Sequence, residues 1–135
     1  MPRPDFRLKV RLRATVSPSE DPGKVAGALQ NVLGGSLEAA GDDWGAELTS
    51  DDVGVISHVK DQLRDRHVRS AARRQMLINS KGRTTFVMLN RQAAAAGIVA
   101  VCGSAEESPL GPIYLSIESD DLPAAIDWLT AYGEG

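Results

Sequence analysis

Basic and apolar side chains alternate through residues 6–16, and no other stretch constrains the fold as strongly. The apolar side chains share one parity, namely Phe6, Leu8, Val10, Leu12, Ala14 and Val16. The basic side chains Arg7, Lys9, Arg11 and Arg13 share the other. Successive side chains of an extended chain point to opposite faces, so this period of two predicts a half-buried strand. We expect the strand to bury its apolar row and to present a ladder of like charges, which an anionic partner such as nucleic-acid phosphate would stabilise.

Length and composition bound the class of protein. The chain has 135 residues, 42% hydrophobic and 24% charged, and we expect one domain over residues 1–135. Its single cysteine, Cys102, excludes an internal disulfide and favours a reducing compartment. Residues 1–5 lead into the charged strand without an apolar signal region, and no stretch is apolar for long enough to form a membrane helix. We therefore expect a cytoplasmic protein without a membrane partner.

The net charge of −3 conceals two basic and two acidic blocks. Residues 1–16 carry a net charge of +4 and residues 62–91 carry +7, whereas residues 17–61 and 92–135 each carry −7. Because a local field depends on how charges are grouped, the acidic total does not argue against an anionic ligand if the two basic segments converge. The alternative is a balanced surface on which basic and acidic blocks pair.

The remaining patterns predict helices and strands in mixed order. A helix over residues 22–33 begins at a cap from Ser19 or Asp21 and ends at Gly34-Gly35. Strands are expected over residues 44–49, 84–89, 98–102 and 113–117. Helical patterns cover residues 53–67, 68–76, 91–96 and 122–129. This order fits an α+β fold, a two-layer α/β sandwich whose mostly antiparallel sheet has helices packed on one face and the other face free.

A second set of cations lies in the second basic block. Arg66, Arg69 and Arg73 stand at positions i, i+3 and i+7 of a predicted helix and so line one exposed face. Arginine's planar guanidinium suits two-point contact with phosphate. With aromatic residues at only 4%, we expect backbone and shape contact with structured RNA rather than stacking on single strands.

Catalytic and metal-binding patterns are weak. The spacing of His58 and His67 places them on opposite faces of a continuous helix, so they cannot share a metal from there. Cys102 ends an apolar strand and is interpreted as a buried, inert thiol. The sequence has no phosphate-binding loop motif, no dinucleotide glycine fingerprint and no zinc-ligand spacing. We therefore expect neither an enzyme nor a metal or cofactor.

Two features of the sequence each allow two interpretations. Residues 103–112 form either a substrate loop or a rigid connector, in which prolines fix φ and Gly111 permits a turn that needs positive φ. Asn90 is either a ligand contact or the N-cap of the short helix that Gly97 ends, and cap statistics favour the second role.

Several segments together resemble a small archaeal family of uncharacterised proteins. The two most recognisable are Asn90-Arg91-Gln92-Ala93-Ala94 and Ser108-Pro109-Leu110-Gly111-Pro112-Ile113. Residues 18–25, 68–74 and 125–129 also resemble family segments, so the likeness covers nearly the whole chain. Arg91 stands where lysine is expected and Ser70 where aspartate is expected, which makes the basic helix more positive here.

The resemblance carries its own expectations. The family is catalogued as candidate RNA-binding proteins, and a related branch is predicted to accompany the RNA exosome. The resemblance implies an archaeal source and a fold similar to the RNA-binding ribosomal protein of the L-five type. Its recognisable motif residues in this chain are Asn90, Gln92, Ser108, Pro109 and Gly111.

The first hypothesis is therefore a non-catalytic protein that binds RNA in archaeal RNA or ribosome metabolism. Its candidate contacts are Arg7, Lys9, Arg11, Arg13, Arg66, Arg69, Arg73, Arg74, Arg83 and Arg91. The alternative is a protein–protein interaction module or homodimer that uses the open sheet face. An RNA-processing assembly is a further candidate partner.

Overall fold

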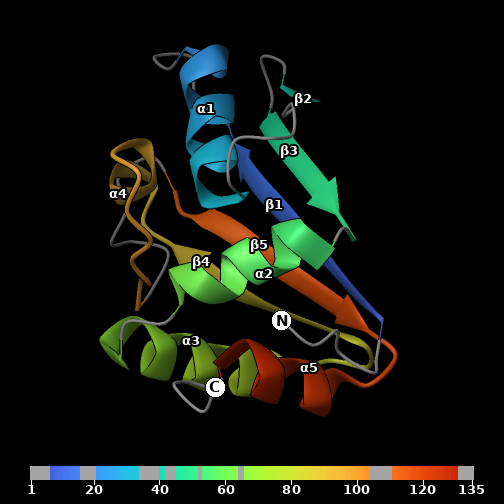
Figure 1. Ribbon diagram of the computed structural model, residues 1–135. Helices are drawn as coiled ribbons and strands as arrows, with labels where there is room; N and C mark the ends of the chain where they lie inside the picture. Colours follow the sequence, from blue (N-terminus) through green and yellow to red (C-terminus); the bar gives the residue numbers. More distant parts are fainter. Residues whose placement is uncertain are drawn as a thin grey trace.

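A five-stranded antiparallel sheet forms one layer, and helices cover one of its faces (Figure 1). The computed structural model describes residues 7–15, 21–33, 40–41, 45–51, 53–63, 66–103 and 111–130. The strands are β1 (Leu8–Thr15), β2 (Ala40–Gly41), β3 (Gly45–Ser50), β4 (Thr84–Leu89) and β5 (Ile113–Ser119). The helices are α1 (Pro22–Leu33), α2 (Val53–Gln62), α3 (Arg66–Ile78), α4 (Arg91–Ala95) and α5 (Leu122–Thr130). The expected α+β fold, with a largely antiparallel sheet, is confirmed.

Strand β1 is the centre of the sheet, in which the strand order is β2-β3-β1-β5-β4. It pairs with β3 on one side and with β5 on the other, both antiparallel. Its residues alternate strictly between buried and exposed, as the sequence predicts. The apolar row of β1 faces the helices, so its basic row lies on the face that the described helices leave uncovered.

The hydrophobic core lies between the sheet and the helical layer. Strands β1, β4 and β5 each contribute one face of their side chains, and α1, α3 and α5 contribute apolar side chains from the other layer. The largest fully buried side chains include Leu12, Leu29, Met76, Leu115 and Ile126. Figure 1 shows α2 crossing over the sheet, with α3 and α5 packed against each other beside it.

The expected boundaries hold for α1 and β4, whose local signals are strong. Asp21 begins α1, because its Oδ1 accepts a hydrogen bond from the Gly23 N–H at 2.9 Å. Strand β5 extends two residues beyond the predicted end at Ile117, to Ser119. The predicted strand over residues 44–49 is displaced by one residue, and the short β2 was not expected.

One predicted strand is wrong. Residues 98–102 have the composition of a strand but form only an isolated bridge between Val101 and Leu89. Two further backbone hydrogen bonds join this segment to β4, from Asn90 N–H to the Ala100 carbonyl at 2.8 Å and from Cys102 N–H to the Met88 carbonyl at 2.9 Å. The turn that follows α4 brings the segment alongside β4 only at residues 100–102, so a regular ladder does not form.

The central position of β1 makes its buried row a sensitive test of the fold. Leu12 is completely buried, so Leu12→Ala should lower the free energy of unfolding by about 2–5 kcal/mol. Arg13→Ala, one residue along on the exposed face, should change it by no more than about 0.5 kcal/mol. Urea denaturation followed by circular dichroism measures both. Similar losses in the two variants would contradict the assignment of the two faces.

Candidate nucleic-acid interface

The uncovered sheet surface, called here the open face, forms a grid of side chains set by strand register. Residues paired across antiparallel strands project to the same face. One row runs from Arg13 through Tyr114 to Met88, and the next from Arg11 through Ser116 to Phe86. The third row runs from Lys9 through Glu118 to Thr84. The open face therefore carries a column of cations on β1 beside columns of polar and aromatic side chains on β5 and β4.

The three cations of the open face are exposed. Alternate residues of an antiparallel strand are about 6.8 Å apart along the chain, so the cations form an evenly spaced row. In the part of the chain that the structure describes, neither Lys9 nor Arg13 forms an ion pair. Glu118 is the cross-strand neighbour of Lys9 and reduces the positive field at that end of the row. On the other side of β1, Glu47 is the cross-strand partner of Arg13. The row is thus a strip of three cations with a glutamate paired in register at each end.

A shallow hollow of about 340 Å³ opens beside this row. Its lining comes from the four strands β1, β3, β4 and β5 and includes Lys9, Arg11, Thr49, Thr84, Ser116 and Glu118. Two cations, three hydroxyls and one carboxylate thus surround a single depression. Such a lining offers hydrogen-bond donors to phosphate and acceptors to a group that itself carries donors, such as a sugar hydroxyl or a base amino group.

Two aromatic side chains meet on the same surface. The ring centroids of Phe86 and Tyr114 are 5.8 Å apart and their planes are inclined by 66°, an edge-to-face contact. Tyr114 remains 37% exposed. The low aromatic content of the sequence gave no sign of this pair, because only the antiparallel pairing of β4 with β5 brings the two residues together.

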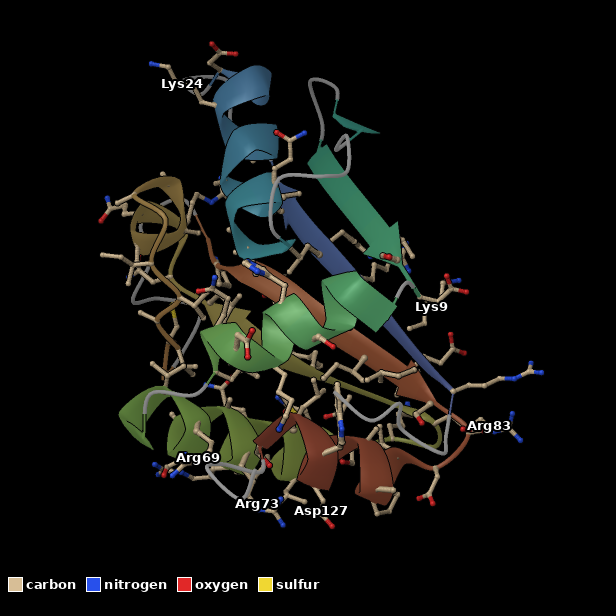
Figure 2. The ribbon with its side chains drawn as sticks, in the orientation of Figure 1. Lys9, Lys24, Arg69, Arg73, Arg83 and Asp127 are labelled. Carbon is tan, nitrogen blue, oxygen red and sulfur yellow. The ribbon has the colours of Figure 1, made fainter. Side chains whose placement is uncertain are left out.

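Two further cations flank the open face at the Lys9 end of the sheet. Arg7 precedes β1, where its backbone N–H donates to Asp120 Oδ1 at 2.8 Å and its carbonyl accepts from Ser119 Oγ at 2.6 Å. Arg83 precedes β4, and its carbonyl accepts from the Ser119 N–H at 2.9 Å. Both side chains are exposed, and Figure 2 shows Arg83 extending beyond the end of the strands.

The arginines of α3 lie on the other layer of the molecule. Ala72 and Met76 of α3 pack into the core, so Arg73 and Arg74 project from the outer side of the helical layer. Figure 2 shows Arg69 and Arg73 at α3, well away from Lys9. Arg66 begins α3, and its side chain falls outside the described part of the structure. The two basic segments therefore do not converge on one face.

Arg73 of α3 stabilises helix packing, whereas Arg69 of the same helix repels a neighbouring cation. The Arg73 Nη1 donates to Asp127 Oδ1 at 2.7 Å and to Thr130 Oγ1 at 3.1 Å, which ties α3 to α5. Arg69 lies close enough to Lys60 for their charges to interact. Burial lowers the pKa of Lys60; Asp61 opposes this change, and Arg69 adds to it. Lys60 Nζ also donates to the Trp128 carbonyl at 2.6 Å and lies 5.2 Å from the centroid of its ring.

Asn90 and Arg91, which begin α4, contribute to the fold rather than to an exposed binding surface. Asn90 is the N-cap of α4, and its Oδ1 accepts a hydrogen bond from the Ala93 N–H at 2.8 Å. Arg91 is only 5% exposed and does not extend an exposed basic surface, whereas Gln92 is exposed. Gly111 has φ of 90°, the positive value that the sequence allowed for, and both interpretations of residues 103–112 stay predictions because residues 104–110 lie outside the described part. Ser108 and Pro109 lie outside the described residues.

Side chains from α3 close the outer edge of β4. Gln75 Oε1 accepts from the Met88 N–H at 2.9 Å, and its Nε2 donates to the Cys102 carbonyl. Asn79 Nδ2 donates to the Phe86 carbonyl at 3.1 Å. Lys81 and Thr84 exchange backbone hydrogen bonds of 2.8 and 3.1 Å. Most outward-facing backbone groups of β4 are therefore already paired, which protects this edge against strand addition.

Two of the residues considered for metal binding or catalysis, His58 and Cys102, are described by the structure, whereas the side chain of His67 lies outside its described part. His58 Nε2 lies 3.0 Å from Gln62 Nε2, within α2, and Cys102 is a buried free thiol. Among the described residues no group of three or more candidate metal ligands occurs. Among the same residues, no helix has the length and apolar character needed to cross a membrane.

Comparison with known proteins places the fold and sequence in one archaeal group. A protein from Sulfurisphaera tokodaii is 36% identical over 125 residues, which cover 90% of this chain and 86% of that protein. One from Methanothermobacter thermautotrophicus is 37% identical over 123 residues, covering 90% and 89%. Both are described as UPF0201 proteins. This chain belongs to the UPF0201 family. No family model matches it.

Solved structures of UPF0201 and DUF54 proteins have the same fold. The crystal structure of a UPF0201 protein from Methanococcus jannaschii matches with a TM-score of 0.73 at 25% identity, covering 90% of this chain and 98% of that one. A DUF54 protein from Methanothermobacter thermautotrophicus matches with a TM-score of 0.64 at 19% identity, covering 93% and 94%. The expected membership of an uncharacterised archaeal family is thus confirmed.

The cap of α4 provides a test of the structural role of Asn90. Asn90→Ala removes the hydrogen bond to the Ala93 N–H and should lower the free energy of unfolding by about 1 kcal/mol. Gln92→Ala, two residues later and exposed, is the matched control and should have little effect. Chemical denaturation compares the two variants. Equal stability of Asn90→Ala and the wild type would argue against the cap role.

Proposed function

We propose that this UPF0201 protein is a non-catalytic RNA-binding protein whose contact surface is the open sheet face. The observation that carries the proposal is the row of exposed cations on β1. The helices cover the opposite face. The cross-strand partners of the row are Ser116, Thr49 and Tyr114, together with Glu118 opposite Lys9 and Glu47 opposite Arg13. Like charges at this spacing repel one another, and a polyanion laid along the strand would relieve that repulsion.

Binding of this kind draws its free energy from counterion release. Each phosphate neutralised by lysine or arginine releases condensed cations from the nucleic acid, so affinity falls steeply as salt rises. The overall charge of −3 does not prevent this, because the field over the open face is set by nearby groups. Arg7 and Arg83 lie at one end of the sheet, where they would extend contact beyond the row itself.

The proposal narrows the sequence hypothesis, in which β1 and the arginine helix act together. Arg73 already binds Asp127 and Thr130, and Arg91 is buried, so neither is well placed for phosphate. The remaining cations of α3 lie on the helical layer and could contact only a ligand that wraps around the molecule. We therefore assign the primary contact to Lys9, Arg11 and Arg13.

The alternative function is a protein–protein module or homodimer formed through the open face. Strand addition at β4 is disfavoured, because α3 and residues 100–102 already occupy that edge. A second copy docked symmetrically on the open face would place cationic rows close together. Both observations favour RNA over a second copy. The setting that we propose, archaeal RNA or ribosome metabolism with an RNA-processing assembly as partner, comes from the family resemblance. The cytoplasmic location that we propose comes from the single cysteine and the lack of a long apolar segment in the sequence.

A pair of matched double variants tests the contact surface. Lys9→Ala with Arg13→Ala removes two cations from the open face and should weaken binding to labelled total RNA fragments. It should also reduce the slope of log affinity against log salt by about 1.5, as expected for two lost phosphate contacts. Fluorescence anisotropy over a range of salt concentrations measures both quantities.

The control removes the same residue types from the helical layer. Lys24 on α1 and Arg74 on α3 are exposed, so Lys24→Ala with Arg74→Ala changes the net charge equally. This variant should retain most of the wild-type affinity and salt slope. Equal losses in the two variants would show that binding depends on net charge alone, and an unaffected open-face variant would remove the proposal.

A further inference from the structure

The contact between Phe86 and Tyr114 places a pair of aromatic rings on a surface that faces solvent. Tyr114 is among the few large hydrophobic side chains with substantial exposure in the described residues, the others being Leu77, Ile78 and Ile98. Whichever ring contributes its edge, the edge-to-face geometry leaves at least one face of the Tyr114 ring clear of Phe86. Because Tyr114 is also 37% exposed, its ring is the candidate surface for a further planar group.

The strand register fixes where this pair lies relative to the cations. Tyr114 is the direct cross-strand neighbour of Arg13, and Phe86 is separated from Arg11 only by Ser116. Neighbouring strands are about 4.8 Å apart, so the aromatic pair lies about one to two strand spacings from the cationic row. A polyanion that follows β1 would therefore carry its side groups over β5 and β4.

The hollow completes the arrangement on the same surface. Its lining runs from Thr49 on β3, past Lys9 and Arg11, to Thr84 on β4, and it includes Glu118. A carboxylate repels phosphate but accepts hydrogen bonds from a ribose hydroxyl or a base amino group. The open face thus offers positive charge to the phosphate backbone and an aromatic ring to a base. It also offers hydrogen-bond donors and acceptors to a sugar or to the edge of a base.

We infer that the open face binds single-stranded RNA, with its phosphates along Lys9, Arg11 and Arg13 and a base stacked on Tyr114. This inference rests on the proposed function and specifies its ligand. In a duplex the base faces are already stacked inside the helix, so the aromatic pair would find no partner there. The low aromatic content of the sequence favours structured RNA, but the position of these two rings favours an unpaired strand.

The test compares an oligouridylate carrying one 2-aminopurine with an RNA hairpin of equal charge. The wild-type protein should bind the single strand more tightly and quench the 2-aminopurine fluorescence. Tyr114→Ala should weaken single-strand binding about tenfold and abolish the quenching, because base stacking on an aromatic ring contributes about 1–3 kcal/mol. Its salt slope should be unchanged, since no phosphate contact is lost.

Tyr114→Phe separates stacking from folding, because it keeps the ring and removes only the hydroxyl. It should retain both the affinity and the quenching, while thermal unfolding confirms that Tyr114→Ala is folded. Wild-type protein that prefers the hairpin, or a folded Tyr114→Ala variant that quenches normally, would overturn the inference. If Lys9→Ala with Arg13→Ala still weakens binding in that case, the proposed function stands and only its ligand is wrong.

Sedimentation of the same samples identifies the competing occupant of the open face. Monomeric protein that forms a one-to-one complex with the single strand would support the inference. A dimer that neither strand nor hairpin dissociates, and whose formation Tyr114→Ala prevents, would show that a second copy covers the open face. That result would overturn both the inference and the proposed function.

Discussion

The rest of the structure depends on one constraint, namely that β1 has an apolar face and a charged face. One row of its side chains is buried against the helices and the other is charged and exposed. A register shift of one residue would place the arginines in the core and the leucines in water, so the pairing of β1 with its neighbours is tightly specified. Because β1 pairs on both sides, that specification extends to β3 and β5, and from β5 to β4.

The same constraint separates the two basic segments. In the described part of the structure, the helices pack on the apolar side of β1. The outer surface of α3 therefore belongs to the helical layer, and the open face is the other side of the sheet. The net charge of the chain therefore does not indicate which of its surfaces are positively charged. Arg73 of α3 takes part in helix packing through Asp127 and Thr130. The cations of β1 have hydroxyl, aromatic and carboxylate residues as cross-strand partners. Only the cations of β1 lie on an exposed surface that also carries the hydrogen-bonding and aromatic side chains needed to recognise a ligand.

The helical layer also decides which surfaces are available to partners. Gln75 of α3 and Asn79 in the turn after it hydrogen-bond to backbone groups of β4 that an edge strand would otherwise present. The sheet is thus closed at that edge and open on its face. A flat, charged and partly aromatic face suits a polymer ligand that lies across several strands, which is why we place the function there rather than at a pocket or an edge.

Local signals in the sequence determined much of this. The alternation through residues 6–16 predicted β1, Asp21 and the glycines after Leu33 set the limits of α1, and Asn90 predicted the cap of α4. These patterns predict local structure correctly because side-chain periodicity, helix caps and turns depend on residues that are close together in the sequence. The strand expected over residues 98–102 failed because composition does not say where an adjacent segment runs. The tertiary structure alone decided that the basic segments part, that Arg91 is buried and that Phe86 meets Tyr114, because strand order and layer packing join residues far apart in sequence.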